Sequence, residues 1–151
     1  MVKNWNRERL QKSIIDDFRS RFAPGARLLY VGASETGSPI LDNAGFEQLG
    51  LAVPNLNQLP DVVLFDPTRN WLFLIQTIIS GGSAASPNRR IELEKLFEEC
   101  SAGLVFLSAF PNFDYFKGIA KEAVWGTSVW LAEIPDHLIH FNGERFLGPH
   151  S

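Results

Sequence analysis

The chain has 151 residues, of which 45% are hydrophobic and 21% charged, and its formal net charge is −3. This length accommodates one domain with a substantial core, and no apolar run approaches the roughly 20 residues that span a bilayer. A single cysteine, Cys100, excludes an internal disulfide and a cysteine-based zinc site, and the polar N-terminus does not resemble a secretion signal, so we expect a cytoplasmic protein without a membrane partner.

The first predicted element is an amphipathic helix over residues 6–22, which Pro24-Gly25 ends. Its apolar stripe consists of Leu10, Ile14, Phe18 and Phe22. Its basic residues are Arg7, Arg9, Lys12, Arg19 and Arg21. We interpret this basic cluster as a solvated helix face, although an acidic net charge is compatible with a local basic surface that meets DNA.

A strand over residues 27–31 and a short helix over residues 42–49 come next, followed by a hairpin. The hairpin is predicted from two β-rich apolar runs and the turn between them, at residues 62–65, 71–79 and 66–70. If Asp66 pairs with Trp71, Asp61 falls opposite Gln76, with about 5 Å between their Cβ atoms. Polar side chains in this apolar setting need hydrogen-bond partners or a bound ion, because a buried unsatisfied group costs about 1–3 kcal/mol.

The second half of the chain alternates helices and strands. After a small-residue loop, the predicted elements are a helix over 87–100, a strand over 103–110, a helix over 113–124, late strands over 127–134 and 137–141, and a tight turn at Asn142-Gly143. Strands that alternate with helices, together with the hairpin, predict an α/β fold with a mixed central sheet and helices on both faces.

Asp61 and Gln76 are candidates for holding a divalent cation. Hard cations such as Mg²⁺ prefer carboxylate, amide and backbone oxygens, and phosphodiester cleavage needs a cation to bind a phosphate oxygen, generate hydroxide and stabilise the leaving oxygen. An Asp at the start of a strand is more commonly a turn or cap residue. The predicted order of helix, three strands, helix and strand is, however, also the order of the PD-(D/E)xK nuclease core.

Four segments resemble, in the same order, the C-terminal catalytic domain of the BsuBI/PstI family of type II restriction endonucleases. They are LPDVVLFDPTRNWLFLIQTIISGG from Leu59, SPNRRIELEKLF from Ser86, AGLVFLSAFP from Ala102 and HLIHFNGERFLGPH from His137. The resemblance runs from about Gly25 to His150. It implies one nuclease-like domain over residues 1–151, in which an N-terminal helix (1–24) precedes a family-like core (25–151), and it implies an additional upstream domain in the relatives.

The resemblance implies a Mg²⁺-dependent enzyme of a restriction-modification system that cuts double-stranded DNA within a short palindrome, CTGCAG for the two namesakes. We expect a homodimer, because a two-fold symmetric target matches a two-fold symmetric protein. Among the site residues, Asp61 matches the metal-binding aspartate and Gln76 occupies the position of the second acidic ligand. Ser80 matches the serine that closes the same stretch.

The resemblance also assigns the basic residues of the site. Arg89 and Arg90 match a basic pair that opens the helix after the hairpin. Ile78 occupies the position at which the superfamily often carries a lysine, so Arg89, Arg90 and Lys95 are the candidates for that role. Relatives commonly have VGDT after the first strand, whereas this chain has VGAS, and Glu35 is the nearest carboxylate.

The sequence leaves three functions open. The first function is an active endonuclease. It stays open because Gln76, although it removes one negative charge from the ion site, still offers an amide oxygen as a ligand. The second is a catalytically inactive DNA-binding module of the same fold, because exchanging Glu for Gln disarms a metal site and reduces its repulsion of phosphate. The third is an interaction domain without nucleic acid, which the acidic net charge permits.

Overall fold

The computed structural model describes residues 5–33, 38–51, 58–79, 87–117 and 128–140, with the side chains of residues 87–90 and 140 left out. Their strands are β1 (Arg27–Val31), β2 (Ile40–Leu41), β3 (Val62–Asp66), β4 (Trp71–Thr77), β5 (Gly103–Phe110), β6 (Ser128–Leu131) and β7 (Leu138–His140). Their helices are α1 (Arg7–Ser13), a π-helical segment η1 (Ile14–Phe18), α2 (Arg19–Phe22), α3 (Asn43–Gln48), α4 (Pro87–Leu96) and α5 (Phe113–Lys117).

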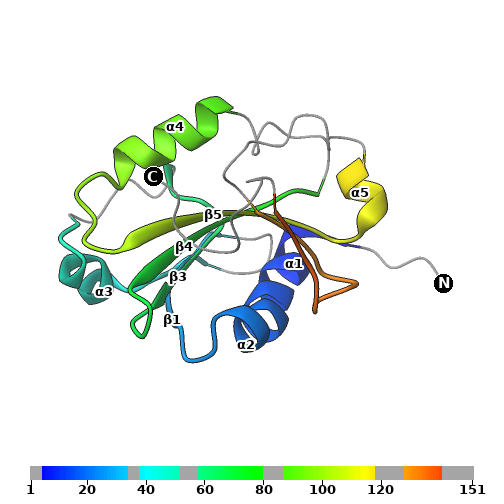
Figure 1. The fold of residues 1–151 in the computed structure, drawn as a ribbon, viewed down its shortest axis with the longest axis horizontal. Coiled ribbons are helices and arrows are strands. Elements are labelled where there is room, and N and C mark those ends of the chain that lie inside the picture. The colour runs from blue at the N-terminus through cyan, green and yellow to red at the C-terminus, as the bar shows by residue number, and fades with distance from the viewer. Residues whose placement is uncertain (1–4, 34–37, 52–57, 80–86, 118–127, 141–151) are drawn as a thin grey trace.

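These strands form one mixed sheet with the order β2-β1-β3-β4-β5-β6-β7. The neighbours β4, β5 and β6 are parallel, and every other pairing in the sheet is antiparallel. The helical segment α1-η1-α2 lies on one face and α4 on the opposite face (Figure 1). The predicted fold class, a mixed sheet with helices on both faces, is therefore confirmed.

Each face of the sheet has its own core. Leu10, Ile14 and Phe18 of the N-terminal helix pack with Val62 of β3 and with Phe73 and Ile75 of β4. Leu93 and Phe97, at the end of α4, pack with Val63 of β3 and with Leu72 and Leu74 of β4. Successive residues of a strand point to opposite faces, so even-numbered residues of β4 face α4 and odd-numbered ones face the N-terminal helix.

The N-terminal helix contains a π-helical turn that its sequence did not reveal. Its buried apolar residues recur at intervals of four, and in an ideal α-helix each such step rotates the side chain by about 40° away from the previous one. The wider turn of η1, between Ile14 and Phe18, offsets part of that rotation. Leu10, Ile14 and Phe18 are all fully buried as a result.

The other predicted elements agree with the structure in position and differ in their ends. The strands over 27–31 and 103–110 have the predicted bounds, and the late strands are shorter than predicted. The helix over 87–100 ends at Leu96, because the chain turns there through the hydrogen bonds Glu98 N to Lys95 O and Cys100 N to Phe97 O. The strand β2 was not predicted. Residues 118–124 and the turn at Asn142-Gly143 lie outside the described residues.

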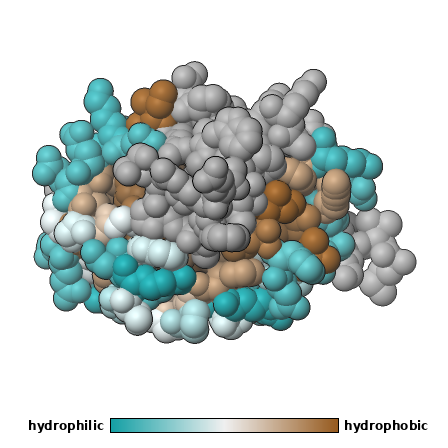
Figure 2. Space-filling view, in the orientation of Figure 1, coloured by the Kyte–Doolittle hydropathy of each residue, from teal (hydrophilic) through white to brown (hydrophobic). Residues whose placement is uncertain are grey.

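The described surface is largely hydrophilic around the edge of the view in Figure 2, with a hydrophobic residue exposed over α4. The exposed large hydrophobic side chains of the described residues are Ile40, Ile91, Phe113, Tyr115 and Ile134. They belong to β2, α4, α5 and the turn after β6, and single exposed apolar residues of this kind are normal on a protein surface. None of the described helices combines the length and apolar character needed to cross a membrane.

The hairpin turn is held by Asp66 and Arg69. Asp66 Oδ1 accepts hydrogen bonds from the backbone N–H groups of Thr68 (3.0 Å) and Arg69 (3.4 Å), and Oδ2 accepts one from Arg69 Nε (2.7 Å). The Arg69 guanidinium also stacks on Trp71 and donates to the Phe22 carbonyl, which ties the turn to the end of α2. Asn70 takes the left-handed backbone conformation (φ 58°), which asparagine tolerates well.

We predict that Asp66→Asn destabilises the fold in a pH-dependent way. Burial raises the pKa of Asp66, but the hydrogen bonds and charge of Arg69 and the Thr68 N–H outweigh it, so the net pKa is lowered. A lowered pKa stabilises the folded state above the pKa of the unfolded chain, and this stabilisation is lost as the pH falls through the folded pKa. Urea unfolding at pH 7 should show a loss of about 1–3 kcal/mol, which shrinks below about pH 4.

Asp114→Asn is the matched control, because it removes a carboxylate from an exposed ion pair with Lys117. Exposed pairs of this kind contribute about 0–1 kcal/mol, so this variant should remain close to the wild type. A loss in Asp66→Asn that is no larger than in the control, or that does not change between pH 7 and pH 3, would contradict the assignment.

Candidate active site

Asp61 lies immediately before β3, at the open end of the hairpin. The register runs from Asp66 opposite Trp71 to Val62 opposite Ile75, as predicted, so Asp61 follows at the level of Gln76. Asp61 Oδ2 accepts hydrogen bonds from the backbone N–H (2.8 Å) and the hydroxyl (2.6 Å) of Thr77. These two bonds fix the carboxylate across the end of β4.

The other oxygen of this carboxylate, Oδ1, pairs with the guanidinium of Arg7 in the first turn of α1. The Arg7 side chain is 51% exposed and the Asp61 side chain only 9%, so a buried carboxylate has an exposed cationic partner. Arg7 therefore lies on an exposed helix face, in agreement with the interpretation of the basic cluster, while its guanidinium also pairs with Asp61. The two residues are 54 positions apart, and no local pattern in the sequence joins them.

The loop after β1 completes this corner of the site. Gly32 N donates to the Asp61 carbonyl (2.8 Å), and Gln11 Nε2 donates to the Gly32 carbonyl (3.3 Å). A Cβ added at Gly32 would lie 3.1 Å from Arg7 Nη2 and 3.6 Å from Tyr30 Oη. Glycine at this position therefore lets the guanidinium come close to the backbone beside Asp61, whereas the phenol would be in ordinary contact with such a Cβ.

Tyr30 contributes a neutral hydroxyl to this corner. Burial raises the pKa of its phenol, Arg7 lowers it in part, and the negative charge of Asp61 raises it again. The net pKa is above the ordinary value, so the phenol is protonated at neutral pH and can donate a hydrogen bond. Tyr30, Thr77 and Gln11 belong to no motif, so the sequence alone did not indicate a role for them.

Gln76 is buried in β4 with 8% of its surface exposed, and it is in register with Ser108 of β5. By the alternation along β4, its side chain belongs to the face that α4 covers, together with Leu72 and Leu74. The hydrogen bonds described for Asp61 go instead to Thr77, the next residue along. The register thus brings Asp61 and Gln76 to the same end of two adjacent strands.

The basic candidates lie at two ends of α4. Because β4 and β5 are parallel, α4 runs back along the sheet between them, so Arg89 and Arg90 in its first turn lie toward the Thr77 end (Figure 1). Lys95 lies in the last turn, six positions after Arg89 and therefore about 9 Å further along the helix axis. The side chains of Arg89 and Arg90, and all of Glu35 and Ser80, lie outside the described part.

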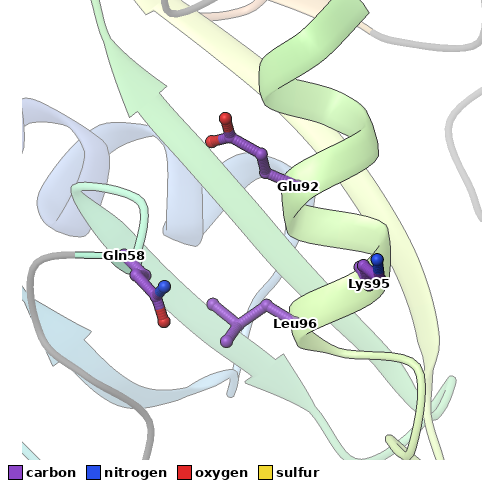
Figure 3. Close-up of a pocket in the computed structure, with 4 residues that line it drawn as sticks. All are labelled: Gln58, Glu92, Lys95 and Leu96. Carbon is purple, nitrogen blue, oxygen red and sulfur yellow. The ribbon is translucent and has the colours of Figure 1, made fainter.

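Lys95 lines a different feature, a pocket of about 290 Å³ between α4 and the segment before β3. Its lining residues are Gln58, Glu92, Lys95 and Leu96. Figure 3 shows Leu96 extending from α4 toward Gln58, with Glu92 on the same side of the helix. Lys95 is thus described as part of the lining of this pocket.

The oxygen atoms at this end of the hairpin suit a hard cation in kind. Asp61 offers a carboxylate and Gln76 an amide oxygen, and the guanidinium at Asp61 Oδ1 shows that this atom takes a positive partner. Because Oδ2 already accepts two hydrogen bonds from Thr77, a divalent cation would bind Oδ1, either together with Arg7 or in place of Arg7. No three His, Cys, Asp or Glu side chains of the described residues gather into a metal site, so water or substrate oxygens would complete the coordination.

Comparison with known proteins places this geometry in a family. The sequence model of the BsuBI/PstI restriction endonuclease domain matches residues 3–144, a range that includes the N-terminal helix. Type II restriction enzyme BsuBI of Bacillus subtilis is 41% identical over 141 residues, which cover 93% of this chain and 44% of that protein. Type II restriction enzyme AplI of Arthrospira platensis is 34% identical over 144 residues, covering 91% of this chain and 44% of that protein.

A solved structure agrees with the sequence relatives. The structure of SdaI restriction endonuclease matches with a TM-score of 0.84 and 38% identity, covering 98% of this chain and 46% of that chain. The chain thus spans less than half the length of each of these proteins.

We predict that Thr77→Val destabilises the protein more than Thr68→Val. The first change removes a hydroxyl that donates to the buried Asp61 carboxylate, whereas Thr68 is an exposed turn residue whose backbone N–H makes its described bond. A hydrogen bond to a charged group contributes about 1.5–3 kcal/mol, so urea unfolding should show a loss of that order for Thr77→Val. Thr77→Ser, which keeps the hydroxyl, should recover most of it. Equal losses in the two valine variants would contradict the role of Thr77.

Proposed function

The chain belongs to the BsuBI/PstI restriction endonuclease family, and from that premise we propose that it is a type II endonuclease domain that hydrolyses phosphodiester bonds of double-stranded DNA at a specific site. The observation that carries the proposal is the carboxylate of Asp61. It is buried immediately before β3, fixed by two hydrogen bonds from Thr77, and level with Gln76 on the adjacent strand. The relatives that match over most of this chain are themselves described as type II restriction enzymes.

In this proposal Asp61 and Gln76 hold Mg²⁺. Thr77 holds Oδ2 of Asp61, so the ion would bind Oδ1, sharing it with Arg7 or replacing Arg7 there, and Gln76 would supply an amide oxygen from β4. When bound, Mg²⁺ would stabilise negative charge on the phosphate and assist deprotonation of the attacking water. Glu35 and Ser80 are proposed as additional oxygen ligands.

The proposal gives the positive charge near the phosphate to Arg89 and Arg90. The first turn of α4 lies toward the Thr77 end of the sheet, which supports this assignment, and the last turn, with Lys95, lies further away. The substrate is double-stranded DNA, and its target is a short palindrome of the kind that the family resemblance implies. A homodimer would match the symmetry of that target.

A catalytically inactive DNA-binding module is the second candidate, and Gln76 favours it. Gln76 is uncharged and buried at the level of Asp61, so the pair carries one negative charge where a pair of carboxylates would carry two. The lower charge weakens attraction for a divalent cation and also weakens repulsion of DNA phosphate. The same protein fold would then bind DNA without cutting it.

We predict that the wild-type chain converts supercoiled plasmid DNA carrying CTGCAG sites into discrete fragments in the presence of Mg²⁺ or Mn²⁺. Asp61→Ala should lower the rate by at least about 100-fold, because it removes the principal carboxylate assigned to the ion. Asp114→Ala, which removes an exposed carboxylate from α5, should leave the rate unchanged. Cleavage that survives Asp61→Ala would contradict the assignment of the metal site.

Gln76→Glu separates the two candidates. If the wild-type chain binds DNA without cutting it and Gln76→Glu cuts it, the chain is an inactive module of the same fold. If neither protein cuts DNA and neither binds a duplex at low salt, both candidates are wrong.

A further inference from the structure

The proposed function leaves one cation of the site without a role. Arg7 reaches Asp61 from α1, on the face of the sheet opposite α4, and its guanidinium is the only positively charged group described in contact with that carboxylate. The basic residues assigned from the sequence all belong to α4. The described structure thus adds a basic group on the other side of the hairpin end.

Several contacts fix the direction from which Arg7 approaches. Asn6 caps the helix, because its side chain accepts from the Arg9 N–H (2.8 Å), and this sets where the first turn of α1 begins. Leu10, fully buried one turn later, anchors that turn on the sheet. Gln11 binds the Gly32 carbonyl, so the helix is also joined to the loop beside Asp61.

The guanidinium then lies against a glycine that leaves room for it. A Cβ at Gly32 would come within 3.1 Å of Arg7 Nη2, closer than ordinary side-chain contacts, whereas the glycine present does not obstruct the group. Tyr30 Oη would lie 3.6 Å from the same Cβ added at Gly32. Arg7, Tyr30 and Asp61 therefore converge on one short stretch of backbone.

The exposure of Arg7 shows what its remaining donors can reach. A guanidinium has five N–H donors in a planar fork, and Asp61 Oδ1 is the acceptor described for this one. About half of the side chain is open to solvent, so the residue is accessible to a ligand beside the carboxylate. A fork of this kind matches the oxygens of a phosphate group in a bidentate arrangement.

We infer that Arg7 is a phosphate-binding residue of this site, which Asp61 holds in position to contact the DNA backbone beside the hairpin end. The inference rests on the proposed function, since it takes DNA as the substrate. It adds a contact from the N-terminal helix to those assigned to α4, so that the DNA phosphate lies between two basic elements on opposite faces of the sheet. Arg7 thereby neutralises the buried carboxylate and attracts the phosphate.

Salt dependence of DNA binding tests this inference. The slope of log K against log salt concentration is negative, and each phosphate contact that is lost reduces its magnitude by about 0.9 for duplex DNA. We predict that Arg7→Gln reduces the magnitude of the slope by about 0.9, whereas Lys12→Gln, which removes one charge from an exposed position on the same helix, leaves it unchanged. Arg7→Lys should keep the slope, because its ammonium still neutralises one phosphate. Fluorescence anisotropy of a short duplex carrying CTGCAG, titrated in EDTA over a KCl series, measures all of these without cleavage.

A second pair of variants covers the case in which Arg7→Gln fails to fold with Asp61 left unpaired. Asp61→Asn and the double variant Arg7→Gln/Asp61→Asn both lack that buried charge, and their slopes should also differ by about 0.9. The inference is overturned, while the proposed function stands, if the wild type and Arg7→Gln have equal slopes or if Asp61→Asn and the double variant have equal slopes. It is also overturned if Lys12→Gln reduces the magnitude of the slope as much as Arg7→Gln does. A wild-type chain that binds no duplex at low salt overturns the proposed function and this inference together.

Discussion

The structure depends on the burial of one carboxylate. Removing an ionised carboxylate from water costs several kcal/mol unless hydrogen bonds and an opposite charge replace the lost hydration. Asp61 obtains these from two elements that are distant in sequence, Thr77 at the end of β4 and Arg7 in α1. The hairpin register and the position of the N-terminal helix are thus coupled at one side chain, because a shift of either would leave one oxygen of the carboxylate without its partner.

The same coupling explains how the sheet presents a site at one end. The turn held by Asp66 and Arg69 fixes the register at one end of the hairpin, and alternation carries that register to Asp61 and Gln76 at the other. The crossover through α4 then returns along the sheet, so the beginning of that helix lies toward the Asp61 end. A rigid core on each face keeps these groups in place. Preorganisation of this kind is what a site for phosphodiester chemistry requires.

Much of this arrangement was predictable from the sequence because it depends on residues that lie close together along the chain. The pairing of Asp66 with Trp71 follows from turn residues five positions apart, and the strands over 27–31 and 103–110 follow from short apolar runs. The contact between Arg7 and Asp61 was not predictable, because it is a tertiary contact and Arg7 reads as an ordinary surface residue of a helix. The π-helical turn depends on packing against the sheet and the two-residue strand β2 on pairing with β1, and neither contact leaves much signal in the sequence.

The central claim is that Asp61 is the carboxylate that binds a divalent cation in a nuclease site. A crystal structure of the chain grown with Mn²⁺, with anomalous scattering recorded at the manganese edge, tests it most directly. The account predicts an anomalous peak at coordination distance from Asp61 Oδ1, with the amide oxygen of Gln76 turned toward it. A peak bound only by other residues, or a fully occupied Arg7–Asp61 ion pair with no peak beside it, would contradict the account.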